Sequence, residues 1–184
     1  MATHDVNLGS GCVSGMFYHA PKGTQLPAYP TQVLGIGWKE VGYISEDGIT
    51  WNTARESETL KDWSKSIRRL LPSDDSPTVT APILSTSTES LKTVFGKVET
   101  EEANKDHGAL SKVTVSAGET SDSEAFLFIG KDDDDTFMLG TSDGYVSSVS
   151  DITFAPGEAV NWEATITADQ WIFMKDDGQV VKTP

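Results

Sequence analysis

The sequence predicts an all-β fold, an antiparallel β-sandwich or barrel with one short flanking helix. Residues 159–169, AVNWEATITAD, alternate apolar and polar side chains as a half-buried strand does. Short apolar runs separated by turn signals recur along most of the chain, a pattern typical of sandwiches and barrels. Helix signals gather in a single stretch. With 184 residues, the chain is predicted to form one domain over residues 1–184.

Two stretches do not fit a compact sandwich. Residues 1–35 are predicted to form an extended N-terminal arm, because prolines sit there among glycines with little periodicity. After a short strand at 41–44 and a turn at 46–48, a long polar loop is predicted over residues 46–63. A loop of this length inside a compact domain requires a function. Aromatic side chains within both stretches favour packing against a neighbouring copy.

The helix is predicted over residues 87–95, within the sequence STSTESLKTVFG. Ser87 or Thr88 can cap its N-terminus, and Gly96 ends it. Its apolar residues fall on one face: Leu91, Val94 and Phe95. We therefore expect this face to seal the sandwich.

The C-terminal half is predicted to consist of further strands. Residues 111–118, SKVTVSAG, alternate as a half-buried strand should. The apolar runs AFLFIG (125–130) and TFMLG (136–140) flank the polar turn KDDDD and predict a hairpin. Residues 171–182, WIFMKDDGQVVK, predict a second hairpin, since the Asp-Gly pair suits a tight turn.

The composition shows a strong acidic surplus. Fourteen Lys and Arg residues against 28 Asp and Glu residues give a formal net charge of −14. Residues 98–135 hold eleven of the acids and three lysines, whereas residues 55–69 hold five basic residues against three acidic ones. This sign of charge is the wrong one for a protein that grips phosphates. The surplus is explained by solubility, or by a surface that avoids nucleic acid or meets a basic partner.

Signals for chemistry are weak. Cys12 is the only cysteine, so stability must come from packing or assembly without an internal disulfide. His4, His19 and His107 are scattered in predicted loops without the close spacing of a metal site. The run Asp132–Asp135 lacks the spacing, glycine and distal Glu of a calcium loop, which favours a solvated turn over a cation site. The sequence therefore predicts no catalytic residue, no cofactor and no metal site, and a protein that is not an enzyme.

Four segments in order resemble one known family. They are SGMFYHAPKGTQLP, WKEVGYISEDGIT, ETLKDWSKSIRRLL and STESLKTVFG, which together span residues 14–96. Each segment is a weak signal alone, but their order and spacing resemble the tail tube (major tail) proteins of long-tailed bacteriophages. The acidic stretch 98–135 departs from that pattern, and the C-terminal half is similar only in general character.

The resemblance implies a self-assembling virion protein. Hexameric rings would stack into a hollow tail tube, and strands from each subunit would complete an inner barrel through which duplex DNA passes without specific binding. Residues 46–63 would be an arm that reaches a neighbouring subunit. The expected partners are other copies of the chain and the tape measure, tail terminator and distal tail proteins. Assembly would occur in the host cytoplasm, with no membrane involved. An acidic lumen would repel phosphates, so part of the surplus charge is expected there or on the outer wall.

An alternative function is a secreted or surface-displayed β-sandwich that binds carbohydrate or protein. Its binding platform would be built from exposed aromatic side chains: Trp51, Trp63 and Trp171. The N-terminus lacks the pattern of a signal peptide, and no apolar run approaches the length of a membrane helix, which counts against this alternative.

Overall fold

The computed structural model describes residues 14–53, 57–61, 63, 67–72, 76–103, 105, 107–116, 121–132, 135–157 and 159–176. Twelve strands and one helix lie in these residues. In chain order they are β1 (Ser14–Pro21), β2 (Lys39–Gly42), β3 (Thr50–Asn52), β4 (Ser57–Lys61), β5 (Ile67–Pro72), β6 (Thr78–Ile83), α1 (Thr88–Phe95), β7 (Val98–Glu101), β8 (Leu110–Val113), β9 (Glu124–Asp132), β10 (Asp135–Val149), β11 (Trp162–Ala168) and β12 (Ile172–Asp176).

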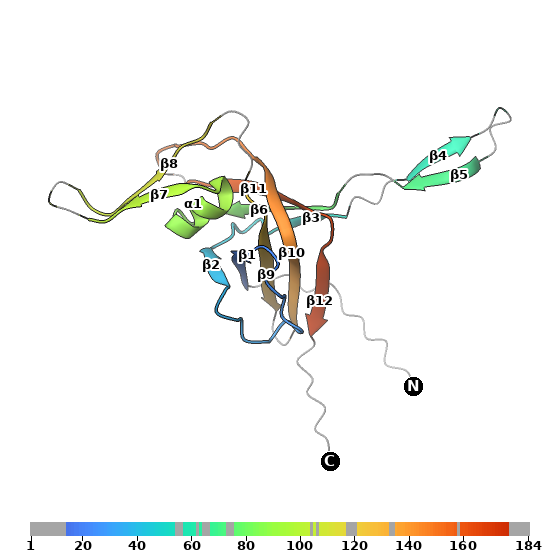
Figure 1. Cartoon of the computed structure of the whole chain (residues 1–184), viewed down its shortest axis with the longest axis horizontal. Coiled ribbons are helices and arrows are strands. Elements are labelled where there is room, and N and C mark those ends of the chain that lie inside the picture. Colours follow the sequence, from blue (N-terminus) through green and yellow to red (C-terminus); the bar gives the residue numbers. More distant parts are fainter. Residues whose placement is uncertain are drawn as a thin grey trace, which may run out of the picture.

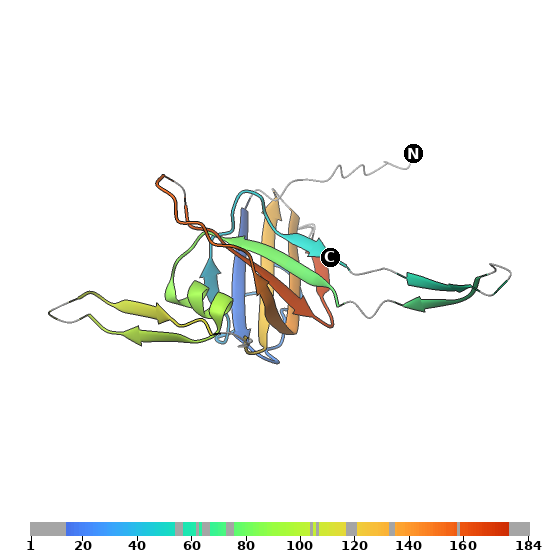
Figure 2. The same cartoon turned by 90° about the horizontal axis from the view of Figure 1, so that it is seen from above.

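One eight-stranded antiparallel sheet forms the body and folds into two layers. The strand order is β2-β1-β9-β10-β11-β6-β3, and β12 also pairs with β10. The long strand β10 belongs to both layers, because its first half pairs with β9 and β12 and its second half pairs with β11. We call β2, β1, β9, the first half of β10 and β12 layer A. Layer B consists of the second half of β10, β11, β6 and β3. Figure 2 shows the two layers crossing face to face.

The two layers close on each other along both sides. On one side the chain after β2 joins the end of β6 through a bridge between Ile44 and Ile83. On the other side Trp51 of β3 stacks on Phe173 of β12, with ring centroids 6.2 Å apart. The resulting body is an antiparallel sandwich whose layers are joined at these two places, which confirms the predicted all-β fold.

The core lies between the layers. Phe17 of β1 stacks on Phe128 of β9 with ring centroids 4.3 Å apart. From layer B, alternate residues of β11 point inward, so that the strand is buried at every second position as its sequence predicts. Burial of these apolar side chains supplies most of the stabilisation of the body. The core residues from β11 are Trp162, Ala164, Ile166 and Ala168.

Layer A is covered on its outer face as well. The segment 22–38 between β1 and β2 crosses that face, where the backbone N–H of Gly23 donates to Ser142 O at 2.8 Å. Leu26 lies so close to Gly140 that an added Cβ would come within 2.8 Å of it. Leu127 and Met138, outside the core cluster, are fully buried as a result. Both faces of β9 are therefore apolar, which explains its continuous run of apolar residues.

The helix forms where the sequence predicts it. Ser87 accepts a hydrogen bond from Ser90 N as the N-cap, and Gly96 follows α1 with a φ of 78°. Ser90 Oγ also donates to Val41 O of β2 at 2.7 Å. The helix packs against β2 and β10, with Leu91 and Val94 buried and Phe95 half-buried. Its apolar stripe thus seals the sandwich, as expected.

Two hairpins project from opposite sides of the body (Figure 1). One is the pair β4–β5, in which Ser57 pairs with Pro72 and Lys61 with Ile67. The other is the pair β7–β8, in which Val98 pairs with Val113 and Glu101 with Leu110. Isolated two-stranded ribbons are marginal in water unless they pack on something. The base of the β7–β8 hairpin packs against α1 and the core through Val98 and Val113, whereas β4 and β5 pair only with each other in the described residues.

The structure corrects several predicted boundaries. Residues 14–21, inside the predicted arm 1–35, form β1 between β2 and β9. Apolar–polar alternation does not reveal this strand, because Gly15, Met16 and Tyr18 do not place a regular series of polar side chains between the core residues. The predicted loop 46–63 begins with a turn ending at Gly48, but then contributes β3 to the body and β4 to a hairpin.

The predicted strand over residues 111–118 is also too long. It ends at Val113, which packs against the core, and Val115 beyond the strand is 74% exposed. The predicted hairpin of β9 and β10 is confirmed, since Asp132 pairs with Asp135. The second strand of the last predicted hairpin lies outside the described residues.

Candidate assembly surface

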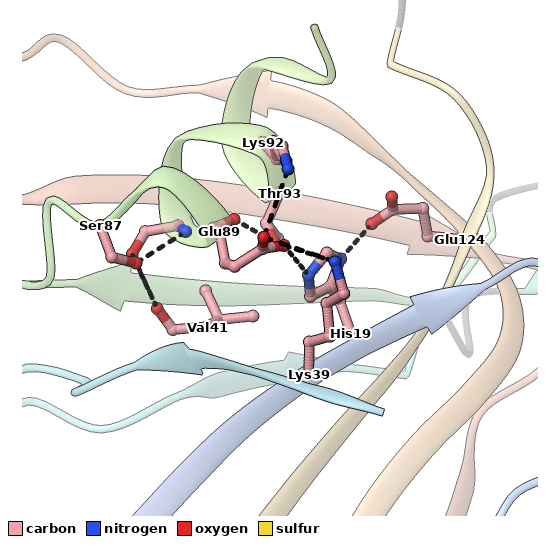
Figure 3. A network of polar contacts seen from close by, with 9 residues as sticks. His19, Lys39, Val41, Ser87, Glu89, Lys92, Thr93 and Glu124 are labelled. Atoms are coloured by element: carbon pink, nitrogen blue, oxygen red, sulfur yellow. Dashed lines mark hydrogen bonds and ion pairs between the residues drawn. The ribbon is translucent and has the colours of Figure 1, made fainter. Parts of the chain in front are cut away.

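A cluster of polar side chains around the buried His19 holds α1 against the body (Figure 3). His19 of β1 is 5% exposed, and its two ring nitrogens each face a carboxylate. Nδ1 lies 2.9 Å from Oε2 of Glu124, and Nε2 lies 3.3 Å from Oε2 of Glu89, in the first turn of α1. Lys39 of β2 and Lys92 of α1 also donate to Glu89. Three strands and the helix therefore meet at one polar cluster.

Both ring nitrogens of His19 lie within hydrogen-bond distance of a carboxylate oxygen. Burial raises the pKa of Glu89, but hydrogen bonds and charges from Lys92 and Lys39 outweigh it and hold that pKa below its usual value. The cluster holds the helix against the strands, since each of its polar side chains has a partner within hydrogen-bond or ion-pair distance.

A groove of about 520 Å³ lies beside the second half of β10. Its walls are the C-terminal end of α1, residues 114–116 after β8, and residues 145–149 of β10. On this side of β10 the pairing with β9 stops at Gly144. Beyond it, the hydroxyl of Ser121 bonds to both the N–H and the C=O of Val146, at 2.9 and 3.1 Å. Within the described residues, a side chain thus stands where a neighbouring strand would pair.

The tryptophans of the predicted binding platform do not meet. Trp171 is 9% exposed, and its Nε1 donates to Pro77 O at 3.2 Å within the core region. Trp51 stacks on the edge of the body, as described above. Trp63 is fully exposed in the turn between β4 and β5, at the far end of a projecting hairpin. The three side chains cannot form one flat surface within a single copy.

The acidic stretch 98–135 is divided among several places. Glu99 and Glu101 lie exposed on the β7–β8 hairpin, where Lys112 pairs with Glu99 at 2.9 Å. Glu124 belongs to the histidine cluster. Asp135 pairs with Lys175 of β12 at 2.6 Å. The described part of the stretch is therefore not a single acidic surface.

Of the three histidines, His19 was placed wrongly by the sequence. It lies in β1 and not in a loop, whereas His107 lies in the connection between β7 and β8 and His4 is outside the described residues. The predicted turn at Asp132–Asp135 is described only at its two ends. Among the described residues, no group of three or more His, Cys, Asp or Glu is arranged to hold a metal ion. In the same part of the chain, no helix is long and apolar enough to cross a membrane.

Comparisons with known proteins identify the family. The sequence model of the phage tail tube protein family matches residues 11–171. Similar solved structures include a chain of the PVC sheath–tube complex, an extracellular contractile injection system in its extended state (11% identity, 95% of this chain and 98% of that chain, TM-score 0.47). Another is a chain of the anti-feeding prophage cap, the AFP tube terminating cap (11% identity, 96% and 100% coverage, TM-score 0.49). A search of curated proteins finds no match. Because the family match spans most of its length, the chain belongs to the phage tail tube protein family.

Proposed function

We propose that the chain is the repeating subunit of a tail tube, in which hexameric rings stack into a hollow tube that conducts duplex DNA. The observation that carries this proposal is the pair of open edges on layer B. Within the described residues, β3 pairs with β6 alone, and residues 145–149 of β10 pair with no strand other than β11, although Ser121 bonds to the backbone of Val146 at that edge. These two strands lie at opposite ends of the same layer.

Open edges at opposite ends suit a ring. Exposed strand edges are hazards that soluble proteins cover or pair, and joining identical sheets edge to edge removes both edges of every copy. Because the two edges differ, the contact is heterologous, and it closes when the rotation between copies completes a circle. The groove beside β10 gives the incoming edge a place to lie, with Val94, Val115 and Val149 as its apolar floor and walls.

The two projecting hairpins support stacking of rings. The β4–β5 hairpin ends in the exposed Trp63, and the β7–β8 hairpin leaves Leu110 46% exposed. Large apolar side chains at the ends of extended ribbons are typical of segments that bury them against a partner. We assign the β4–β5 hairpin to a neighbouring ring, which moves the predicted arm from residues 46–63 to residues 57–72.

A charge placed in the groove tests the proposal. Val115→Lys should leave the fold intact, since this side chain is mostly exposed, but should prevent rings and tubes, because a buried ammonium in the contact is costly. The matched control is Val33→Lys, a change at a 91% exposed valine on the segment over layer A. Circular dichroism measures the fold, and negative-stain electron microscopy measures assembly.

The expected result is tubes from the unsubstituted protein and from Val33→Lys, and folded but unassembled Val115→Lys. Normal tubes from Val115→Lys would remove the groove from the contact between copies. Failure of the unsubstituted protein to assemble, even with other tail proteins present, would overturn the proposed function itself.

In this proposal the chain has no catalytic role, and its partners are other copies of itself and the tape measure, tail terminator and distal tail proteins. Assembly takes place in the host cytoplasm, and the finished protein resides in the virion. Family membership supports a structural role. The buried polar cluster around His19 is consistent with that role, because its side chains bond to one another and hold the helix and strands together.

A further inference from the structure

The outer face of layer B carries hydroxyl and amide side chains in rows across its four strands. Residues opposite one another in the ladders define the rows. One row is Tyr145, Thr167, Thr78 and Asn52, and the next is Ser148, Thr165, Thr80 and Thr50. The four strand segments (50–52, 78–83, 145–149 and 162–168) contain no lysine or arginine and a single carboxylate, Glu163.

Some of the hydroxyl groups on this face donate within the sheet. Thr167 Oγ1 donates to Ser147 Oγ at 2.8 Å, and Ser147 Oγ donates to the carbonyl of Thr165 at 3.1 Å. Thr80 and Thr165 share a hydrogen bond at 3.2 Å between their Oγ1 atoms. Beside the rows, Ser150 Oγ donates to Glu163 Oε1 at 2.7 Å. The face is polar and wettable, but several of its hydroxyl protons are already engaged.

The opposite side of the molecule is different in kind. Segment 22–38 covers the outer face of layer A, and the residues beneath it, such as Leu127 and Met138, are fully buried. Layer B therefore has the outer sheet face that no other segment covers in the described part of the chain. Its rows also reach both open edges, with Tyr145 and Ser148 at one and Asn52 and Thr50 at the other. Joining copies edge to edge would continue the rows around the ring.

We propose that this hydroxyl face of layer B lines the tube and forms the wall along which duplex DNA moves, with segment 22–38 facing outward. The inference rests on the proposed function and adds the orientation of the subunit and the chemistry of the wall. It differs from the sequence-based expectation of an acidic lumen, because the four strand segments that would meet the DNA carry one carboxylate per copy.

A wall of this composition suits passage of DNA without binding. Affinity for the duplex comes largely from cations that displace counterions from phosphates. Further contacts come from side-chain and backbone donors to phosphate oxygens. The face supplies no side-chain cation, and the hydrogen bonds within the sheet occupy several of its hydroxyl donors. Phosphates therefore find little to hold them, whereas water can wet the surface.

Cysteine labelling of assembled tubes tests the orientation. Thr165→Cys and Thr78→Cys place a thiol near the centre of the hydroxyl face, and Gln25→Cys places one on the exposed surface of segment 22–38. All three are made with Cys12→Ser. Each protein is treated, as tubes and after the tubes are dismantled, with N-ethylmaleimide and with a polyethylene-glycol maleimide too bulky to enter a channel sized for duplex DNA.

We expect Gln25→Cys to react with both reagents in both states. Thr165→Cys and Thr78→Cys should react with the small reagent in tubes but lose reaction with the bulky one until the tubes are dismantled. Reaction of the bulky reagent with residue 165 or 78 in intact tubes would overturn the inference while leaving the proposed function standing. Protection of the same positions from the small reagent would also overturn it, because the face would then be buried between copies. If the unsubstituted protein forms no tubes, both proposals fall together.

Discussion

At the scale of single residues, the charges around His19 decide where α1 sits. The histidine, two carboxylates and two lysines come from β1, β2, β9 and α1, and each partner offsets the cost of burying another. Glu89 makes contacts with three of them. Removing its charge therefore tests the whole cluster.

We expect Glu89→Gln to lower the free energy of unfolding at neutral pH by about 1 kcal/mol, the usual size for a partly exposed charged hydrogen bond. The lysines hold the pKa of the folded Glu89 below its usual 4.5, so its stabilising effect exists above that value and is lost as the pH falls through the folded pKa. The difference between the variant and the unsubstituted protein should therefore shrink in acid. Urea unfolding across the pH range measures it.

Glu99→Gln serves as the control for this prediction. Glu99 pairs with Lys112 on the projecting hairpin, and both side chains are more than two-thirds exposed. Its loss should change the stability little at any pH. A Glu89→Gln difference that stays constant well below pH 4.5 would show that the carboxylate charge is not what holds the helix.

At the scale of elements, α1 depends on the apolar contact between its last turn and β11. Phe95 meets Trp162 edge to face with ring centroids 5.6 Å apart. Phe95→Ala should cost about 3 kcal/mol, the lower end for loss of a phenylalanine, since the side chain is only half-buried. Thermal melting gives the change. Phe154→Ala is the matched control, because that ring also meets Trp162 but is 75% exposed and should cost much less. Equal losses would mean that burial of Phe95 is not the cause.

The β4–β5 hairpin is the element that we expect to be dispensable for folding. Replacing residues 57–72 with a short glycine-serine linker should leave the circular dichroism and the cooperative melting of the body unchanged, since β4 and β5 pair only with each other in the described structure. Tubes seen by electron microscopy should be lost. A deletion of residues 50–60 would be a poorer test, because it also removes β3 from the body. Loss of the fold on replacing residues 57–72 would show that the body needs the hairpin in order to fold.

At the scale of the whole molecule, we expect the chemistry of the proposed tube wall to set how DNA moves. Thr165→Lys puts one cation per copy on the hydroxyl face, and in the proposed tube the stacked rings would repeat this charge along the channel. In virions with tails of normal length, we expect slower ejection of the genome and recovery of the rate as salt is added, because phosphate attraction is screened. Gln25→Lys is the control on the outer surface and should eject normally. Equal rates for the two variants at low salt would show that DNA does not meet this face.

The sequence by itself determined the elements whose signals are local. The alternation in β11 and the cap, stripe and terminal glycine of α1 are read within about ten residues, and the structure confirms both. The ordered segments within residues 14–96 also sufficed for the resemblance to tail tube proteins, which the family match confirms. The hairpin of β9 and β10 was predictable for the same reason.

Only the tertiary structure decided which distant segments meet. His19 lies 70 residues from Glu89 and 105 from Glu124 in the sequence, and no local pattern announces a pair at such separations. The place of β1 inside the sheet, the change of layer along β10 and the rows of hydroxyl groups arise from pairing among strands far apart in the chain. A threonine on a strand is locally the same whether its face meets solvent, another subunit or DNA. Which of these it meets depends on which sheet face other segments of the folded chain cover, and this is known only from the tertiary structure.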